Sequence, residues 1–269
     1  MPLKIATWNI NSVRLRIDLV TRYLAEAAPD VLCLQETKCP DAEFPRGALA
    51  DVGYRHLIHR GMKGYNGVAI LARRPIREAD RMSFCGREDA RHIAAEIEDD
   101  AGKALIVHNF YIPAGGDIPD REANPKFGHK LDFLAELSDW SSAAARQNER
   151  WVVVGDLNIA PLVADVWNHK ALLSVVSHTP VETEALTTIL NKGAWTDAVR
   201  HLHPEPQTLF SWWSYRSPDW SAADKGRRLD HVWVGEALRT RIASAELRRD
   251  ARGWDRPSDH IPVAVTLSD

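Results

Sequence analysis

Cysteine is scarce in this chain of 269 residues, which contains only Cys33, Cys39 and Cys85. Their number is odd and no two have Cys-x-x-Cys spacing, so the sequence predicts neither a disulfide framework nor a structural zinc site. We expect all three to be reduced, with Cys33 in the core. The sequence also lacks any run near the ~20 apolar residues of a membrane helix and lacks the apolar segment of a signal peptide. We therefore expect a cytoplasmic protein without a membrane partner.

Low-complexity segments, linkers and a strong excess of one charge are missing as well. Hydrophobic residues make up 45% of the chain and charged residues 26%, which excludes disordered and fibrous classes. The net charge of −3 does not by itself indicate a nucleic-acid partner. It does not exclude one, because carboxylates that hold a cation can coexist with a separate basic face. At roughly 150 residues per domain, the length allows one large domain or two small ones.

Apolar runs of strand length recur along the chain, and few helical patterns separate them. The predicted strands are residues 3–8, 31–34, 68–71, 104–110, 151–154, 229–234 and 261–267. Helices are predicted around residues 17–24, 127–140 and 182–191. This mixture favours two sheets packed face to face with helices outside. Loops 60–67, 113–125 and 214–227 are rich in Gly, Pro, Asp, Asn and Arg and could surround a site at one edge of the sheets.

The most informative segment is the run 151–161, where a strand ends at Gly155 and is followed by Asp156 and Asn158. In an extended chain these two side chains point the same way. An acid beside an amide suits chemistry at a phosphate, although an ordinary turn at a strand end explains the same residues.

Other predicted strand ends also present polar side chains, namely Asn9, Glu36, Tyr111, Asp230, Asp259 and His260. Each has a local explanation alone, but their recurrence favours a site. Among the histidines we choose His260, because Asp259 precedes it and a further acid could orient its ring. The other histidines, such as His56, His59, His201 and His203, lack a comparable acidic neighbour at a strand end.

Eight motifs follow one another along the chain. They are Trp-Asn-Ile-Asn-Ser-Val-Arg at 8–14, Pro-Asp-Val-Leu-Cys-Leu-Gln-Glu-Thr-Lys at 29–38, Gly-Tyr-Asn-Gly-Val-Ala-Ile at 64–70, Tyr-Ile-Pro at 111–113, Gly-Asp-Leu-Asn at 155–158, Phe-Ser-Trp-Trp at 210–213, Arg-Leu-Asp at 228–230 and Ser-Asp-His at 258–260. In this order they resemble the exonuclease III family of abasic-site endonucleases, of the bacterial exodeoxyribonuclease III type, across essentially the whole chain.

The resemblance implies a single domain over residues 1–269 with an α/β fold, a four-layer sandwich of two packed mixed β-sheets flanked by helices. This is the endonuclease/exonuclease/phosphatase fold. The implied activity is that of a metal-dependent phosphodiesterase of base excision repair. It would cleave 5′ to abasic sites and act as a 3′-to-5′ exonuclease that cleans 3′ ends. The implied partner is double-stranded DNA with abasic sites or 3′ ends, bound by a monomer.

The resemblance also implies roles for individual residues. Mg²⁺, or Mn²⁺ in its place, would be bound by Glu36 and Asp259. Asn9 would support these ligands, and the wider metal set includes Asp156, Asn158 and His260. Asp156 would deprotonate or orient the attacking water and Asn158 would position it. Phosphate oxygens would be held by Tyr111 and His260, with Asp230 paired to the His260 ring.

The resemblance further implies that DNA is contacted by Asn11, Lys38, Lys63, Arg91, Lys126, Lys130 and Trp212. Trp212 would lie against the abasic deoxyribose, and Trp213 would pack beneath the loop. For each basic residue, an ordinary solvent-exposed position without DNA contact is an alternative of equal weight.

Two segments depart from the family pattern. Asn-x-Gly-x-Arg-Leu-Asp is replaced by Asp-Lys-Gly-Arg-Arg-Leu-Asp at 224–230, and Phe-x-Pro-Glu-Glu is replaced by Ser-His-Thr-Pro-Val-Glu at 177–182. Because these loops border the lesion pocket, the sequence leaves open the ratio of abasic-site incision to 3′-end trimming. It also leaves open the number of metal ions and the preferred metal. Two other hypotheses remain, a phosphoesterase for small or lipid substrates and a non-catalytic DNA-binding module on the same fold.

Overall fold

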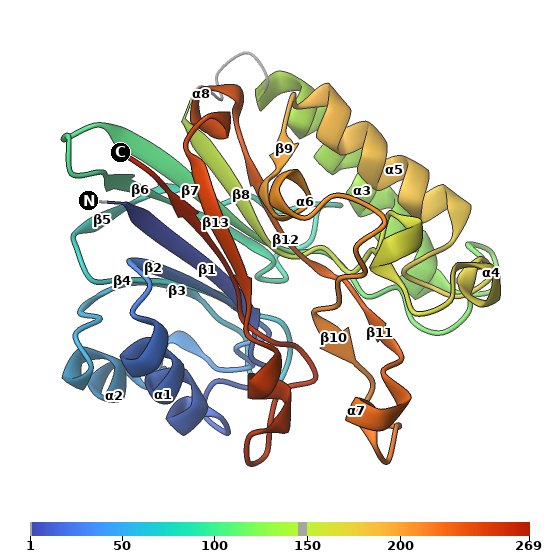
Figure 1. The fold of residues 1–269 in the computed structure, drawn as a ribbon, viewed down its shortest axis with the longest axis horizontal. Helices are drawn as coiled ribbons and strands as arrows, with labels where there is room; N and C mark the ends of the chain where they lie inside the picture. The colour runs from blue at the N-terminus through green and yellow to red at the C-terminus, as the bar shows by residue number, and fades with distance from the viewer. Residues whose placement is uncertain (1, 145–149) are drawn as a thin grey trace.

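Two six-stranded mixed β-sheets pack face to face, with helices on both outer faces (Figure 1). The structure is a computed structural model that describes residues 2–144 and 150–269. The strand orders are β13-β14-β1-β2-β4-β3 in the first sheet and β5-β6-β7-β8-β12-β9 in the second. The pairs β1/β2 and β7/β8 are parallel, and the other neighbouring pairs are antiparallel. The predicted four-layer α/β sandwich is confirmed.

The bounds of the elements are as follows. The first sheet consists of β13 (Ile242–Leu247), β14 (Val263–Leu267), β1 (Leu3–Asn9), β2 (Val31–Gln35), β4 (Val68–Ala72) and β3 (His56–Arg60). The second consists of β5 (Ile76–Asp80), β6 (His92–Glu98), β7 (Ala104–Tyr111), β8 (Trp151–Asp156), β12 (Asp230–Val234) and β9 (Thr196–Asp197). A short hairpin is formed by β10 (Trp212–Trp213) and β11 (Gly226–Arg227). The helices are α1 (Ile17–Ala27), α2 (Arg46–Asp51), α3 (Pro125–Ala144), α4 (His169–Leu172), α5 (Pro180–Lys192), α6 (Ala198–Leu202), α7 (Trp220–Ala223) and α8 (Glu236–Arg239).

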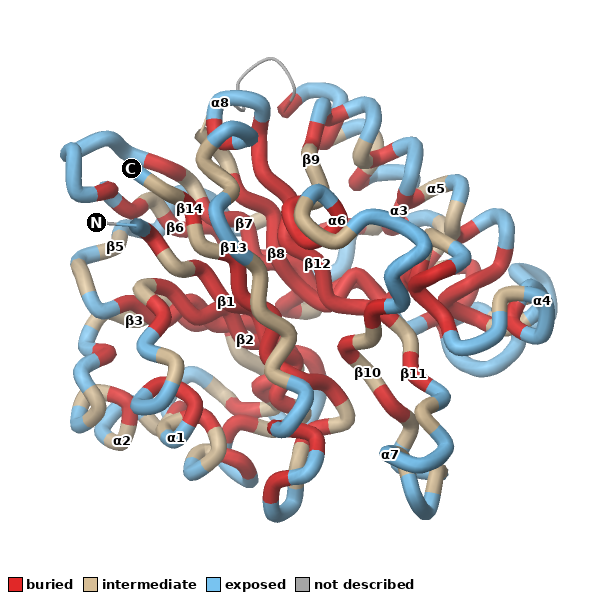
Figure 2. The backbone as a smooth tube through the Cα atoms, in the orientation of Figure 1, coloured by how far each residue is buried: buried red, intermediate tan, exposed pale blue. Residues whose placement is uncertain are grey.

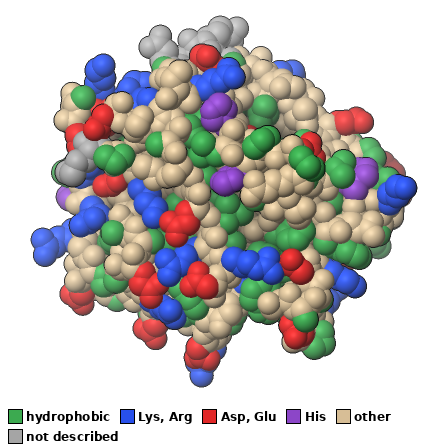
Figure 3. Space-filling view, viewed as in Figure 1, with side chains coloured by type: hydrophobic (Ala, Val, Ile, Leu, Met, Phe, Trp, Pro, Cys, Tyr) green, Lys and Arg blue, Asp and Glu red, His purple; other side chains and the backbone are tan. Residues whose placement is uncertain are grey.

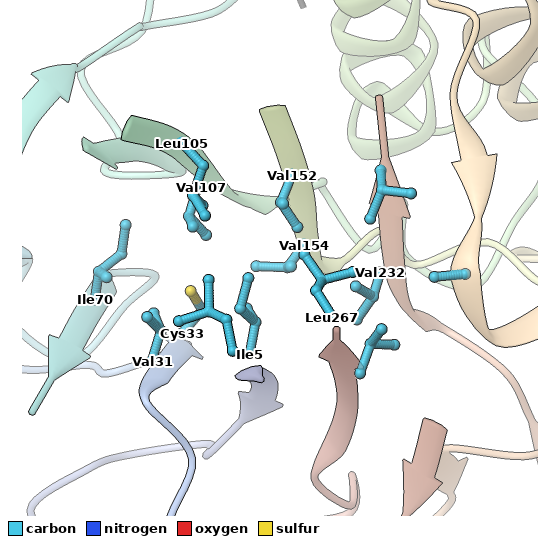
Figure 4. Close-up of a cluster of buried hydrophobic side chains, with 14 of the residues drawn as sticks. Ile5, Val31, Cys33, Ile70, Leu105, Val107, Val152, Val154, Val232 and Leu267 are labelled. Carbon is cyan, nitrogen blue, oxygen red and sulfur yellow. The ribbon is translucent and has the colours of Figure 1, made fainter. Parts of the chain in front are cut away.

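Alternation along each strand decides which layer a side chain joins. In β1, Leu3 and Ile5 belong to the apolar cluster between the sheets, whereas Ala6 and Trp8 belong to the cluster under α1. Figure 4 shows side chains of both sheets meeting in the central cluster. The strands at the centre of the molecule are buried, as Figure 2 shows.

Helices cover the outer face of each sheet. Helix α1 buries Val20, Tyr23 and Leu24 against the first sheet. Helix α3 buries Phe133 and Leu134 against the second sheet and packs beside α5 (Figure 1). Helix α5 begins with a capping box at Thr179 and a proline at its first position. Among the described residues, no helix combines the length and apolar character needed to cross a membrane.

All the predicted strands and helices are present, with small shifts in their ends. Strand β12 begins one residue after the predicted start at Leu229, and β14 begins at Val263 instead of Ile261. The strands β3, β5, β6, β9, β10, β11 and β13 and the helices α2, α4, α6, α7 and α8 were not predicted. Cys33 is fully buried and the three cysteines are free, as predicted.

Strands β7 and β8 approach each other closely at Gly155, and a substitution there tests this contact. The φ of Gly155 is +144°, and a Cβ atom there would lie 1.9 Å from the carbonyl oxygen of Phe110. We predict that Gly155→Ala lowers the free energy of unfolding by at least ~2 kcal/mol, because the backbone of β7 or β8 must move to make room for the added methyl group. Gly47→Ala is the matched control, since nothing lies within 4 Å of its Cβ position, and it should be neutral or stabilising by up to ~1 kcal/mol. Urea unfolding followed by circular dichroism measures both, and equal stabilities would contradict the prediction.

Candidate active site

The interface between the sheets is apolar along most of its length and becomes polar at one end. Asn9 ends β1, Tyr111 ends β7, Asp156 ends β8 and Asp230 begins β12. In the strand register, Asp156 lies opposite Asp230 and beside Tyr111. Alternation places Asp156 on the same face as Val154, which lies in the central core. Four predicted site residues are therefore gathered at one end of the core.

His260 lies between two carboxylates of this end. Its Nδ1 is 2.8 Å from Asp230 Oδ2, and its Nε2 is 3.6 Å from Asp156 Oδ2. All three side chains are buried. Burial alone would lower the pKa of His260, but the charges of Asp230 and Asp156 outweigh burial and raise that pKa to about 10. The ring is therefore an imidazolium at neutral pH, with both nitrogens as donors.

Asp156 is fixed by neighbouring amides. It accepts hydrogen bonds from Asn9 Nδ2 at 2.8 Å, from the Asn158 backbone nitrogen at 3.0 Å and from Asn158 Nδ2 at 3.1 Å. Burial raises the pKa of Asp156 to about 7, helped by Asp230 and opposed by His260. A carboxylate with a pKa near neutrality can accept a proton from water at physiological pH.

The pairing of Asp156 with Asn158 has a different cause from the one predicted. Strand β8 ends at Asp156, and Asn158 has a left-handed backbone with φ of +53°. Asparagine tolerates this conformation because its short polar side chain bonds locally. Asn158 Nδ2 also donates to the Ile112 carbonyl at 2.9 Å. A turn, and not extended alternation, therefore brings the two side chains together.

Glu36 follows β2 and accepts hydrogen bonds from three directions. The donors are Asn9 Nδ2 at 3.0 Å, Tyr111 Oη at 2.7 Å and Lys38 Nζ at 2.7 Å. Burial would raise the pKa of Glu36, but the Lys38 charge and these hydrogen bonds outweigh burial and lower it. The carboxylate is therefore charged at neutral pH.

Asp259 joins the same network through two neighbours. Asn11 Nδ2 donates to Asp259 Oδ1 at 3.2 Å, and Trp212 Nε1 donates to Asp259 Oδ2 at 2.9 Å. Lys38 Nζ donates to Asn11 Oδ1 at 2.7 Å, which connects the Glu36 and Asp259 sides of the site. The predicted residues Asn11, Lys38 and Trp212 thus lie in direct contact with the carboxylates.

The oxygen donors of this network suit a hard divalent cation. Glu36 and Asp259 offer carboxylate oxygens and no sulfur ligand is among the contacts described above, which fits Mg²⁺ or Mn²⁺. Asn9 turns its Nδ2 toward Glu36 and Asp156, and its Oδ1 accepts from the Asn11 backbone nitrogen at 3.1 Å. Asn9 is therefore placed to support carboxylates more than to bind a metal ion itself.

A second group could hold a metal ion by distance alone. One atom each of Asp156, Asp230 and His260 lies within 4.8 Å of the others. Here the hydrogen bond between Asp230 and the His260 ring already explains the close approach. An imidazolium between two carboxylates also neutralises much of the charge that would attract a cation. We therefore interpret this group as a hydrogen-bonded relay.

A pocket of 520 Å³ opens beside the network. Its lining includes Glu36, Asn158, Asp259 and His260. It also includes Trp167 and Val176, which the sequence did not predict, and Ser177, Lys225 and Arg227, which lie in the two segments that the resemblance placed beside the pocket. Two of the three predicted site loops, 113–125 and 214–227, contribute to this lining.

The remaining predicted DNA contacts differ in exposure. Lys63 and Lys126 are exposed. Arg91 is buried, pairs with Asp89 at 2.5 Å and lies 4.9 Å from the centroid of the Tyr111 ring. Its contact with DNA stays a prediction. On the face that Figure 3 shows, Lys and Arg are interspersed with Asp and Glu, so that face has no large area of one charge.

The prediction of a DNA contact by Lys130 is wrong. The Lys130 side chain is 0% exposed, as is Glu182, and Nζ lies 2.5 Å from Glu182 Oε1. Nζ also donates to the Asn158 carbonyl at 2.8 Å. The ammonium group therefore faces the interior, because a buried carboxylate and a carbonyl replace its water shell.

Sequence reasoning missed the polar contacts beneath the site. Gln35 Nε2 donates to Thr7 Oγ1 at 2.9 Å and to Asn109 Oδ1 at 2.7 Å. Asn109 Nδ2 donates in turn to the Leu34 and Ala69 carbonyls. The signal was present in the sequence, since an amide inside an apolar strand must find a partner to avoid a cost of ~1–3 kcal/mol.

Comparison of the whole chain with known proteins agrees with this geometry. The profile of the endonuclease/exonuclease/phosphatase family matches residues 6–260. The chain belongs to this family. It is 32% identical to exodeoxyribonuclease III of Haemophilus influenzae, over 97% of this chain and 98% of that protein.

Two solved structures of the endonuclease/exonuclease/phosphatase fold are also similar. One is a 3′ phosphatase from Neisseria bound to a product DNA hairpin, with a TM-score of 0.89, 31% identity and coverage of 99% of this chain and 100% of that chain. The other is an AP endonuclease from Archaeoglobus fulgidus, with a TM-score of 0.88, 32% identity and the same coverage.

The burial of Lys130 makes a prediction that separates it from the exposed Lys126 nearby. Lys130→Met should lower the free energy of unfolding by ~3–5 kcal/mol, because it leaves the Glu182 carboxylate buried without its partner. Lys126→Met should change stability by less than ~0.5 kcal/mol, since its side chain is exposed. Chemical unfolding measures both variants. A stable Lys130→Met protein with weakened DNA binding would contradict the structural role.

Proposed function

We propose that this chain is a metal-dependent DNA-repair nuclease. It cleaves double-stranded DNA 5′ to abasic sites and acts from 3′ ends, where it removes nucleotides and blocking groups. The observation that carries the proposal is the continuous network from Asp230 through His260, Asp156 and Asn9 to Glu36 beside one pocket. The similarity of this chain to an exodeoxyribonuclease III and to an AP endonuclease supports the same conclusion.

The network provides the groups for in-line attack of water on a phosphodiester. Asp156 takes the proton of the attacking water, and Asn158, hydrogen-bonded to Asp156, positions that water. The His260 imidazolium and the Tyr111 hydroxyl donate hydrogen bonds to phosphate oxygens as negative charge builds on them. Asp230 is a positioning residue that orients the His260 ring. The P–O bond to the 3′ oxygen breaks as the bond to water forms, the leaving 3′ oxygen takes a proton from solvent, and no covalent intermediate is needed.

Glu36 and Asp259 would hold Mg²⁺, or Mn²⁺ in its place. When bound, the ion supplies Lewis-acid stabilisation of the charge on the phosphate. Asn9 keeps the Glu36 carboxylate oriented through a hydrogen bond of 3.0 Å. The Tyr111 hydroxyl donates its one proton to the same carboxylate in this structure, and would turn that proton to a phosphate oxygen when DNA binds.

DNA binding would use residues around the network. The exposed side chains of Lys63 and Lys126 would contact backbone phosphates, and such contacts give affinity without sequence preference. Trp212 would lie against the deoxyribose of an abasic site, because its ring borders the pocket and is anchored to Asp259. Asn11 and Lys38 would meet the strand near the ion site.

We also propose that residues 1–269 form one domain, since the central cluster takes residues from strands of both sheets. The monomeric state and the cytoplasmic location stay predictions. Light scattering and cell fractionation measure them.

Asp156 gives the direct test of this function. On a duplex with one abasic analogue, we expect Mg²⁺-dependent incision that EDTA abolishes and that Asp156→Asn slows at least ~100-fold, because the proton acceptor is lost. Asp51→Asn, an exposed change in α2, should leave the rate within about twofold of the original.

Three results would refute this function. They are no metal-dependent incision by the unmodified protein, full activity of Asp156→Asn, and turnover of a small phosphodiester that excess duplex DNA does not inhibit. The last result would favour the small-substrate hypothesis. Tight binding of abasic DNA without turnover would favour the non-catalytic one.

A further inference from the structure

The two segments that depart from the family pattern contact each other in the pocket. Arg227, at the end of β11, donates from Nη1 to Ser177 Oγ at 2.7 Å and to the Val176 carbonyl at 2.8 Å. Its guanidinium carbon lies 5.3 Å from the centroid of the Trp212 ring. All four residues line the pocket that also contains His260. The departures thus form one structural unit beside the reacting groups.

Arg227 forms no ion pair among the described residues, and the one carboxylate whose charge raises its pKa, Glu182, is already paired with Lys130. Within residues 2–144 and 150–269, no carboxylate lies within ion-pair distance of its guanidinium, and its buried Nε has no hydrogen-bond partner. Neighbouring buried cations are paired, Arg228 with Asp165 and Lys130 with Glu182. Arg227 is half-buried and its buried Nε has no partner, so part of this charge is removed from water without a carboxylate beside it, and this favours an anionic partner that arrives with the substrate.

The support of Arg227 is rigid. Ser177 has a positive φ of +83°, a conformation that costs a residue with a side chain ~1–3 kcal/mol. Glu182 holds that conformation, because both of its carboxylate oxygens accept from the Ser177 backbone nitrogen at 2.9 Å. Lys130 in turn neutralises Glu182. A guanidinium fixed in this way loses little conformational entropy when a ligand binds.

We propose that Arg227 forms an anion subsite next to the scissile phosphate. The subsite binds a second anionic group of the substrate, which is either the next phosphate of a continuous strand or a carboxylate on a blocked 3′ end. This inference rests on the proposed function and names the substrates that the site prefers. The chemistry is shared by both sources, since a guanidinium offers parallel N–H donors to the oxygens of either group.

Two pairs of duplexes distinguish the sources. The first pair has a recessed 3′ end with a phosphoglycolate or its neutral glycolamide analogue. The second has an internal abasic analogue followed by a phosphate or a neutral methylphosphonate. We expect kcat/KM to favour the anionic member of at least one pair by ~10-fold or more, as a charge-assisted hydrogen bond would.

Variants assign that preference to Arg227. Arg227→Leu should reduce the ratio to within about twofold while changing kcat/KM for the neutral member less than about threefold, because only the anionic contact is lost. Arg227→Lys should retain part of the ratio, because the charge remains and the fork geometry does not. The matched control is Arg77→Leu, which removes the same charge from an exposed position in β5 and should keep the original ratio.

The possible outcomes separate cleanly. A preference in the first pair alone assigns the subsite to blocked ends, and one in the second pair alone assigns it to the strand phosphate. Ratios near one for the unmodified protein, or an unchanged ratio in Arg227→Leu, overturn the inference and leave the proposed function intact. If the unmodified protein cleaves none of the four duplexes in the presence of Mg²⁺, both the proposed function and this inference are refuted. Thermal unfolding checks each variant, and Arg227→Gln replaces Arg227→Leu in the same comparison if the latter is unfolded at the assay temperature.

Discussion

The Asn9 side-chain amide is the contact on which the rest of the site depends. Its Nδ2 donates to Glu36 at 3.0 Å and to Asp156 at 2.8 Å, although Asp156 ends a strand of the second sheet and Asn9 ends one of the first. Its Oδ1 accepts from the Asn11 backbone, so rotation of the amide would break every one of these bonds. Two carboxylates that would repel each other are thereby fixed across the interface of the sheets.

The position of this contact follows from the alternation of side chains. The inner faces of the two sheets are apolar over most of their length and polar at the end where the site lies. The sheets therefore enclose one apolar core with a polar layer at that end. Gln35 and Asn109 lie at that transition and hydrogen-bond to each other across the interface. Gln35 Nε2 and both ends of the Asn109 amide are hydrogen-bonded within the protein, and Gln35 Oε1 is the one atom of the two amides that has no partner there.

Strand ends were predictable because a central strand shows its apolar run in the sequence, as Trp151 to Val154 does. Edge strands were not, and neither was the internal strand β6, whose sequence His-Ile-Ala-Ala-Glu-Ile-Glu contains no long apolar run. Strand β5 reads Ile-Arg-Glu-Ala-Asp and is mostly exposed, so no apolar alternation marks it. Lys130 was misassigned for a related reason. A lysine in a helix reads as a solvated cation until its partner is known, and Glu182 is distant in the sequence. The contact of Arg227 with Ser177 likewise joins residues 50 positions apart, and only the fold places them together.

Burial and carboxylate charge together give the acid and the imidazole of the site their different tasks. Asp230 lies 2.8 Å from the His260 ring and Asp156 lies 3.6 Å from it. The nearer carboxylate therefore dominates the ring, which holds its proton with a pKa of about 10. Asp156 has a pKa of about 7 because burial outweighs the attraction of His260, so it can still gain and lose a proton near neutrality. In a solvated site Asp156 would be ionised at any pH above ~4 and the ring would be neutral above its usual pKa of ~6.5. The proton donor and the proton acceptor therefore have different causes, because the charges of Asp230 and Asp156 hold the proton on His260 against the effect of burial, whereas burial itself brings the pKa of Asp156 toward neutrality.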